Sequence, residues 1–251
     1  MVRYMNLMVL FLVAVASPIH AIDTLQVLAS DPILDERRWT LFDKSNGLVG
    51  RVNDLYEDRH NNIWFGTTVG VQKYDGLKWS TYTVEDGLAH KWVSAVIGDR
   101  DGAMWFGTGS GISRLSVSET GQQHWTTYAF DNSLSVLSLC EAGDGAIWAA
   151  LGGRLVIRRF ADGKWSVVAP KTGSSQLRVG KIIQASDGKL WFGTNEGVLC
   201  YDGSSWTLTS AGSGSQLIEA SDGSIWAHRK DEVSRFDGHS WTSYSTSEVG
   251  F

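Results

Sequence analysis

Tryptophan recurs along this chain at an almost constant interval, and that interval restricts the possible folds more than any other feature. Tryptophans that follow a turn signal within an apolar segment are Trp64, Trp105, Trp148, Trp191 and Trp226. A second set is Trp39, Trp79, Trp125, Trp165, Trp206 and Trp241. Neighbours within a set are about 40 residues apart, and only Trp92 of the 12 tryptophans belongs to neither set. The chain is therefore expected to repeat one structural unit.

Each unit reads as four short strands. In the second complete unit we expect strands over 93–99, 103–108, 111–117 and 124–130, with a tight turn at Asp101-Gly102 because glycine tolerates a positive φ. Many glycines (28) with few prolines (3) suit short strands and tight turns. A period of about 40 residues with four strands predicts an all-β fold, a β-propeller of four-stranded blades.

The phrase "MWFGT" (104–108) supports this fold. Adjacent Trp and Phe point to opposite faces of a strand, so both faces must be apolar, as in a sheet packed between two others. A β-sandwich is the rival, but its strands alternate and it needs no fixed period. We count five complete units and a sixth outer strand around Trp39, which predicts either an incomplete ring or five blades with a surplus strand.

The chain starts with a segment that resembles a secretory signal. Residues 1–21 combine a basic start with an apolar run of about half the ~20 residues that span a bilayer, and cleavage is expected after Ala21, with Ala16 as the alternative. We divide the rest into a lead-in (22–37), the propeller repeats (38–245) and a tail (246–251). The mature protein is expected to be exported, to the periplasm or the cell exterior.

Composition excludes some partners. The formal net charge is −5 and no basic run occurs, which disfavours nucleic acid, and no later segment is apolar enough to span a membrane. Cys140 and Cys200 fall at different places in the repeat, so we expect two buried, unpaired thiols, although an exported protein could oxidise them.

One repeat is similar to a known family. The stretch "WFGTTVGVQKYDGLKWSTYTVEDGL" (64–88) resembles the two-component regulator propeller repeat, and the resemblance extends over about 38–245. In that family such repeats form the periplasmic sensor part of hybrid two-component systems, many of which respond to oligosaccharides. An immunoglobulin-like domain, a membrane helix and a histidine kinase follow the propeller there. The resemblance implies a non-enzymatic, ligand-sensing propeller in signal transduction, with further blades or a kinase as partners.

The loops of one face are the expected binding site. In a four-stranded blade the second-to-third strand loops and the blade-to-blade loops share a face, and here they vary most. The candidate ligand-binding residues are Trp92, His90, Lys91, Arg178, Lys181, His228, Arg229 and Lys230. Trp92 could stack on a sugar ring or simply cap its blade. The cations favour an anionic oligosaccharide, a neutral one being the alternative, although scattered surface charge also accounts for them.

An enzyme is the main alternative function. Streptogramin lyases are propellers with similar blades, and they use a histidine base and a metal. Of the histidines, only His90 and His228 are expected on the loop face, and no paired carboxylates lie beside them in sequence. No nucleophile-elbow, zinc-protease or phosphate-loop motif occurs. We therefore expect no catalytic residues, no cofactor and no metal, with a lyase or a protein–protein interaction scaffold as alternatives.

Overall fold

The computed structural model describes residues 41–130, 134–170, 172–174, 176–209, 216–229 and 232–245, and the compact unit treated below begins at Asp43. The predicted signal segment, lead-in and tail, together with Trp39 and Lys230, lie outside the described residues. Among the described residues, no helix has the length and apolar character that crossing a membrane requires.

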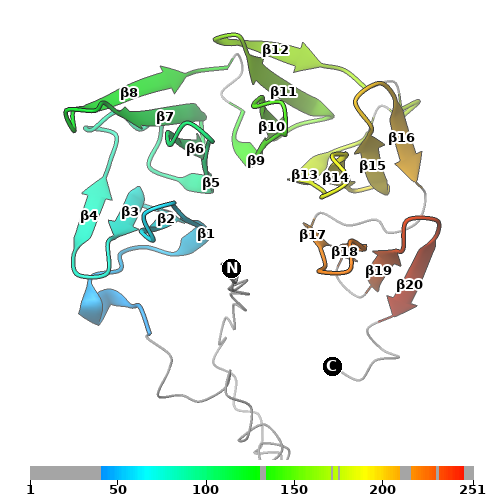
Figure 1. Ribbon diagram of the computed structural model, residues 1–251, viewed down its shortest axis with the longest axis horizontal. Coiled ribbons are helices and arrows are strands. Elements are labelled where there is room, and N and C mark those ends of the chain that lie inside the picture. The colour runs from blue at the N-terminus through cyan, green and yellow to red at the C-terminus, as the bar shows by residue number, and fades with distance from the viewer. Residues whose placement is uncertain are drawn as a thin grey trace, which may run out of the picture. The chain divides into compact units, whose positions relative to one another are not determined.

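The described chain consists of five antiparallel sheets of four strands, in which strand order follows chain order (Figure 1). We number these sheets blades 1 to 5. A short 3₁₀ turn, η2 (Lys44–Asn46), precedes them. The strands are β1 (Val52–Glu57), β2 (Ile63–Thr67), β3 (Val71–Tyr74) and β4 (Trp79–Tyr82) in blade 1; β5 (Val93–Gly98), β6 (Met104–Thr108), β7 (Gly111–Val117) and β8 (Gln123–Tyr128) in blade 2; β9 (Val136–Glu141), β10 (Ile147–Leu151), β11 (Val156–Ala161) and β12 (Lys164–Val168) in blade 3; β13 (Val179–Gln184), β14 (Leu190–Thr194), β15 (Val198–Tyr201) and β16 (Trp206–Thr209) in blade 4; β17 (Gln216–Glu219), β18 (Ile225–Arg229), β19 (Glu232–Phe236) and β20 (Trp241–Ser245) in blade 5.

The predicted all-β architecture of four-stranded blades is confirmed. In blade 2 the expected strands differ from the observed ones by no more than two residues at either end, and Gly102 has the positive φ (+89°) that its turn requires. Every described blade has its own outer strand. Of the sixth outer strand expected at the N-terminal end, residues 38–40 lie outside the described residues, and Leu41, Phe42 and Asp43 form no strand.

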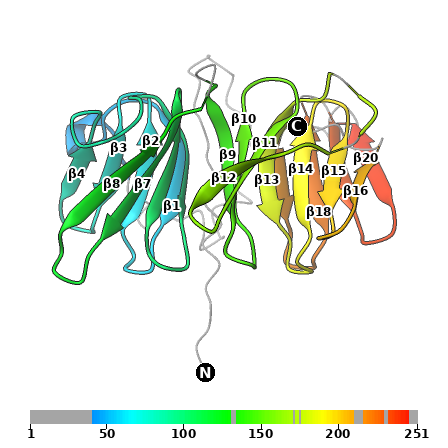
Figure 2. The same cartoon turned by 90° about the horizontal axis from the view of Figure 1, so that it is seen from above.

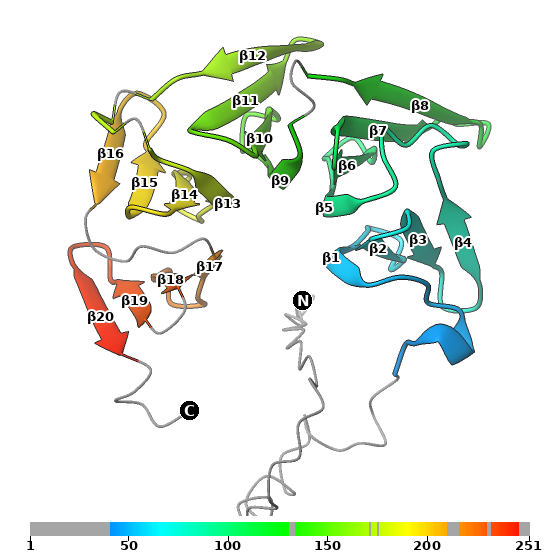
Figure 3. The ribbon, with the colours of Figure 1, turned by 180° about the vertical axis from the view of Figure 1, so that it is seen from behind.

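The blades pack face to face in chain order, with β1, β5, β9, β13 and β17 innermost (Figure 1; Figure 3 gives the view from behind). Figure 2 shows the strands of neighbouring blades standing side by side. The tryptophan of each "Trp-Phe" pair faces the following blade, and in blades 2 and 4 the phenylalanine faces the preceding one: Trp64 and Phe106 share the core between blades 1 and 2. Trp148 and Phe192 likewise share the core between blades 3 and 4. The doubly apolar strand inferred from the sequence thus belongs to a blade enclosed by two others.

The Gly-Thr that follows each "Trp-Phe" has two separate roles. A Cβ on Gly107 would lie 2.6 Å from Val136 Cγ1 of the following blade, so only hydrogen fits there. Thr108 is fully buried, and its hydroxyl donates to the carbonyl of Gly111 at 2.8 Å. The pair therefore lets two blades approach closely and holds the adjoining loop, which fixes the start of the next strand.

Candidate functional site

The residue that directly precedes the innermost strand occupies the same backbone position in successive blades. These residues are Arg51, Trp92, Ser135 and Arg178 in blades 1 to 4. In each case the carbonyl oxygen accepts a hydrogen bond from the loop between the second and third strands, donated by the amides of Thr68, Gly109, Gly152 and Asn195. The repeated bond gives these side chains the same starting point on the loop face of their blades.

Two of the predicted site residues, Trp92 and Arg178, are therefore equivalent, and the structure adds Arg51 to them. The Arg51 guanidinium carbon lies 5.6 Å from the centroid of the Trp92 ring, and that side chain is still 42% exposed. Arg178 is also exposed. A cation–π contact thus holds the Arg51 guanidinium beside an indole that remains accessible to solvent.

Backbone contacts fix the loop that carries Trp92. The amide of Trp92 donates to Nδ1 of His90 at 3.1 Å, so this nitrogen acts as the acceptor and Nε2 is left to carry the proton. His90 is half-buried, and a Cβ on Gly109 would come within 2.6 Å of its ring. Lys91 is exposed. Three of the predicted residues thus form one loop segment beside Arg51.

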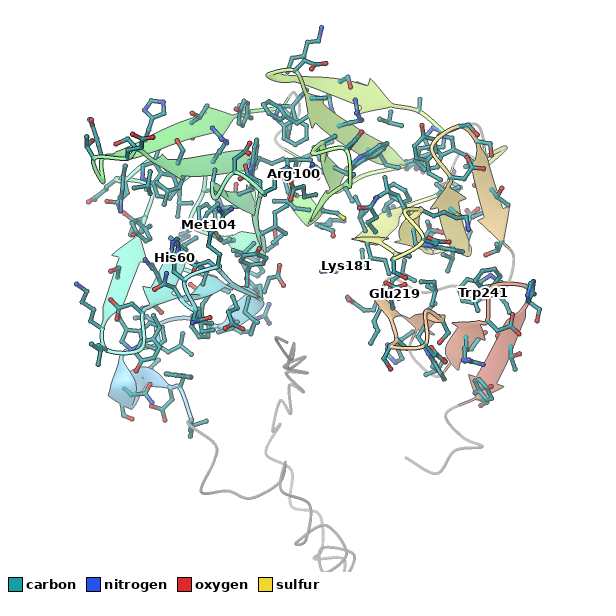
Figure 4. The ribbon with its side chains drawn as sticks, in the orientation of Figure 1. His60, Arg100, Met104, Lys181, Glu219 and Trp241 are labelled. Atoms are coloured by element: carbon teal, nitrogen blue, oxygen red, sulfur yellow. The ribbon has the colours of Figure 1, made fainter. Side chains whose placement is uncertain are left out.

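Lys181 lies in a different place from the one that sequence reasoning assigned to it. It is the third residue of β13, not a loop residue, and it extends towards the centre that the inner strands share (Figure 4). The positive charge of Lys181 acts to lower the pKa of two groups on other blades, Asp54 of β1 and Cys140 of β9. Burial raises the pKa of Asp54, and the Lys181 ammonium opposes that rise.

The remaining predicted residues belong to blade 5. His228 lies in β18 and is exposed, at the position of Gly66 and Gly107 in blades 1 and 2. Arg229 is the last residue of β18, and Lys230 lies outside the described residues. These residues are thus carried by a different blade from Trp92.

A groove of about 690 Å³ lies between blades 1 and 2, on the side of the tight turns. Sequence reasoning missed it because the tight turns of this side were expected to be purely structural, and candidate residues were sought among the variable loops of the opposite face. His60 and Met104, on its two sides, are labelled in Figure 4. Its lining includes Tyr56, Asp58, Arg59, His60, Trp64, Lys73, Tyr82, Asp99, Arg100, Asp101, Met104, Leu115, Val117, Gln123 and Glu141.

Many charged groups of this groove are engaged within the protein. Asp58 accepts from the Trp64 indole at 2.8 Å, and its hydrogen bonds to Trp64 and Asn62 outweigh desolvation and lower its pKa. Arg59 Nη2 donates to the carbonyl of Arg100 at 2.8 Å. Lys73 lies over the Trp64 ring at 5.3 Å. Two of these contacts lie within blade 1, and the Arg59–Arg100 hydrogen bond joins blade 1 to blade 2.

Both cysteines are free and partly buried, as expected for unpaired thiols. Burial raises the pKa of Cys140 and of Cys200 to about 11. Thiolate, the nucleophilic form, is therefore scarce near neutral pH. In the described part of the chain, no group of three His, Cys, Asp or Glu side chains is placed to hold a metal ion.

Comparison with known proteins gives one family match and a set of similar folds. A family model described as "Two component regulator propeller" matches residues 46–68 and 87–110. No curated protein sequence matches the chain.

Three solved structures illustrate the range of proteins with this fold. Virginiamycin B lyase from Staphylococcus aureus, crystallised in an inactive form with quinupristin, is 15% identical with a TM-score of 0.65, over 79% of this chain and 71% of that one. The extracellular domain of a protein described as a hybrid two-component system, from B. thetaiotaomicron, is 20% identical with a TM-score of 0.61, over 76% of this chain and 28% of that one. PorZ from Porphyromonas gingivalis, a surface component of the type-IX secretion system, is 15% identical with a TM-score of 0.59, over 84% of this chain and 36% of that one.

At these identities the solved structures show the fold alone, and they include both lyases and an extracellular domain of a two-component system. The family match falls on blades 1 and 2, in the stretches that contain Trp64 and Trp105 with their Gly-Thr pairs. Two stretches of this chain thus match the two-component regulator propeller model, and both lie in four-stranded blades.

Proposed function

We propose that the protein is an exported, non-catalytic propeller that binds an oligosaccharide bearing negative charge, as the sensing part of a signalling system. The observation that carries this proposal is the equivalence of Arg51, Trp92 and Arg178, which start the inner strands of blades 1, 2 and 4 on one face. The relation to two-component propeller repeats supports a sensing role, and the extracellular domain among the similar folds supports export.

The chemistry of this face suits such a ligand. The exposed part of the Trp92 ring offers an apolar surface for the C–H face of a sugar, and the Arg51 and Arg178 guanidinium groups can bind carboxylate or sulfate with two parallel hydrogen bonds. Arg51 pairs with no carboxylate within 4 Å among the described residues. A sulfated or uronic-acid oligosaccharide provides both parts.

Calorimetric titration of the full chain, exported with its own leader and purified, would test the proposal. The probes are a trigalacturonate and a neutral trisaccharide of galactose. We expect the acidic probe to bind and its affinity to fall at least tenfold in Trp92→Ala and in Arg51→Gln, because each removes one part of the recognition. Lys78→Gln, a change of the same charge on the opposite side of blade 1, should leave affinity unchanged.

Three results would contradict this assignment. Equal binding of both probes would mean that charge is not recognised, and binding that Lys73→Gln abolishes while Trp92→Ala does not would move the site to the groove between blades 1 and 2. Cleavage of the probe, detected as new products by mass spectrometry and lost in His90→Ala, would favour the lyase alternative.

A further inference from the structure

Two of the four junctions between neighbouring blades share a polar contact near the inner end of the tight-turn side. Between blades 2 and 3, Arg100 Nε lies 2.8 Å from Glu141 Oε1. Between blades 4 and 5, the hydroxyl and the amide of Ser186 donate to the Glu219 carboxylate at 2.6 and 2.9 Å. In both cases a turn residue of one blade binds a glutamate at the end of the innermost strand of the next.

The tryptophans make the apolar part of the same junctions. Trp191 of blade 4 lies 5.3 Å from Phe236 and 6.3 Å from Trp241 of blade 5, measured between ring centroids. Trp105 of blade 2 contacts Phe160 and Trp165 of blade 3 in the same way. At the junctions between blades 2 and 3 and between blades 4 and 5, one blade thus contacts the next through a turn donor, a glutamate and an aromatic group.

Blade 5 presents the first half of this junction, and among the described residues no strand of another blade covers it. Ser221 holds the turn position of Ser186 and is exposed. Ile218 is 55% exposed and Tyr244 is 38% exposed, on the face that carries Trp226. The tryptophans equivalent to Trp226 in blades 1 to 4 are at most 4% exposed, whereas Trp226 is half-buried.

Blade 1 presents the other half. Glu57 ends β1 at the position of Glu141 and Glu219, and it is exposed. Val52 and Leu55 of the same strand are only half-buried, whereas their counterparts in the next blade, Val93 and Val96, are at most 2% exposed. In the part of the chain that the structure describes, the inner part of this face is thus less covered than the same face of blade 2.

We propose that blade 5 of one molecule docks on blade 1 of a second copy, in the geometry of the existing junctions, with Ser221 donating to Glu57. The interface would continue the one between blades 4 and 5, with Ser221, Glu57 and Trp226 in the places of Ser186, Glu219 and Trp191. The two halves within one chain lie at opposite ends of the blade series (Figure 1). Joining them within one chain would require established junctions between blades to change, whereas docking a second copy leaves those junctions as they are.

His228 sets the strength of this association. It takes the place of Gly66 and Gly107, where a Cβ would lie 2.8 Å from Val96 and 2.6 Å from Val136 of the following blade. In the docked pair the His228 side chain therefore faces Val52 of the second copy, and it must adopt a rotamer that avoids this valine. Such a side chain limits end-to-end growth without preventing it, as natural proteins do at exposed edges.

Sedimentation velocity from 1 to 200 µM and site-specific cross-linking would test the proposal. On a background with Cys140→Ala and Cys200→Ala, one sample carries Ser221→Cys and another carries Glu57→Cys. We expect a short bismaleimide to link the two variants into a covalent dimer only when they are mixed. His228→Gly should increase the association constant at least tenfold, and Glu57→Ala should decrease it, because each change acts on a different side of the interface.

Control variants separate specific docking from random cross-linking and from misfolding. Ser204→Cys, in an exposed turn of blade 4, should give no dimer with Glu57→Cys. Far-UV circular dichroism of every variant checks that the blades are intact. A link formed within one chain that carries both cysteines would overturn the proposal in favour of a ring closed by the molecule itself. A monomer at all concentrations in both the unmodified protein and His228→Gly would also overturn it. Oligosaccharide titration plays no part in this test, so its outcome is independent of the proposed function.

Discussion

At the scale of single residues, the repeated tryptophans do not have equal surroundings. Asp58 and Asp99 accept the indole N–H of Trp64 and Trp105, each at 2.8 Å. Alanine replaces this aspartate in blades 3 and 4, and the buried indole nitrogens of Trp148 and Trp191 have no hydrogen-bond partner among the described residues. An unpaired buried donor costs about 1–3 kcal/mol. The buried indole N–H groups are thus hydrogen-bonded in blades 1 and 2 but not in blades 3 and 4 of the described chain.

This difference predicts two changes of opposite sign. Asp58→Ala should lower the free energy of unfolding by about 1–3 kcal/mol, because it leaves the Trp64 indole unpaired. Ala142→Asp should raise it by about 1 kcal/mol, because Ala142 begins the equivalent turn and the new carboxylate can accept from Trp148. Urea unfolding at pH 7.5 measures both. A loss of stability in Ala142→Asp would show that the third turn cannot orient a carboxylate towards the indole.

At the scale of strands and blades, close approach depends on the residue after each "Trp-Phe". Gly107→Ala should destabilise the protein by about 1–3 kcal/mol, since the added methyl meets Val136 Cγ1 at 2.6 Å and Ala95 Cβ at 3.1 Å, neither of which can move freely. His228→Ala, at the equivalent and exposed position of blade 5, should change stability by less than about 0.5 kcal/mol. Thermal unfolding at low protein concentration compares the two. Equal effects would contradict the packing role assigned to Gly107.

The contrast between local and long-range contacts also decides how much of the structure was predictable from the sequence. Regular spacing and doubly apolar strands depend on local patterns, so the blades and their turns were predictable. The partner of Trp92 was not, because Arg51 is 41 residues earlier and reaches the ring only through the packing of two blades. Lys181 was assigned to a loop because strand ends shift by a residue or two, and the groove beside His60 arises from two turns that no local pattern connects.

At the scale of the whole molecule, charges on separate blades meet at the centre of the inner strands. Asp54 of blade 1 accepts from the amide of Val96 at 2.8 Å, and its pKa is raised by burial and held down by Lys181 of blade 4. A raised folded pKa means that this carboxyl favours folding most when it is protonated. Its contribution is complete below its unfolded pKa of about 3.9 and is lost as pH rises through the folded value.

Asp54→Asn should therefore raise the urea midpoint at pH 7.5 and make no difference near pH 3, because the amide oxygen can still accept from Val96 without the cost of a buried charge. Lys181→Gln should lower the midpoint at pH 7.5 in the unmodified protein but not in Asp54→Asn, since the cation then has no carboxylate to balance.

Asp75→Asn is the matched control. Hydrogen bonds from the amides of Lys78 and Leu77 lower the pKa of Asp75, so its stabilising effect is present at neutral pH and is lost on acidification, the reverse of Asp54. If Asp54→Asn unfolds at a lower urea concentration than the unmodified protein at pH 7.5, the attraction between Asp54 and Lys181 outweighs the cost of burying the carboxylate.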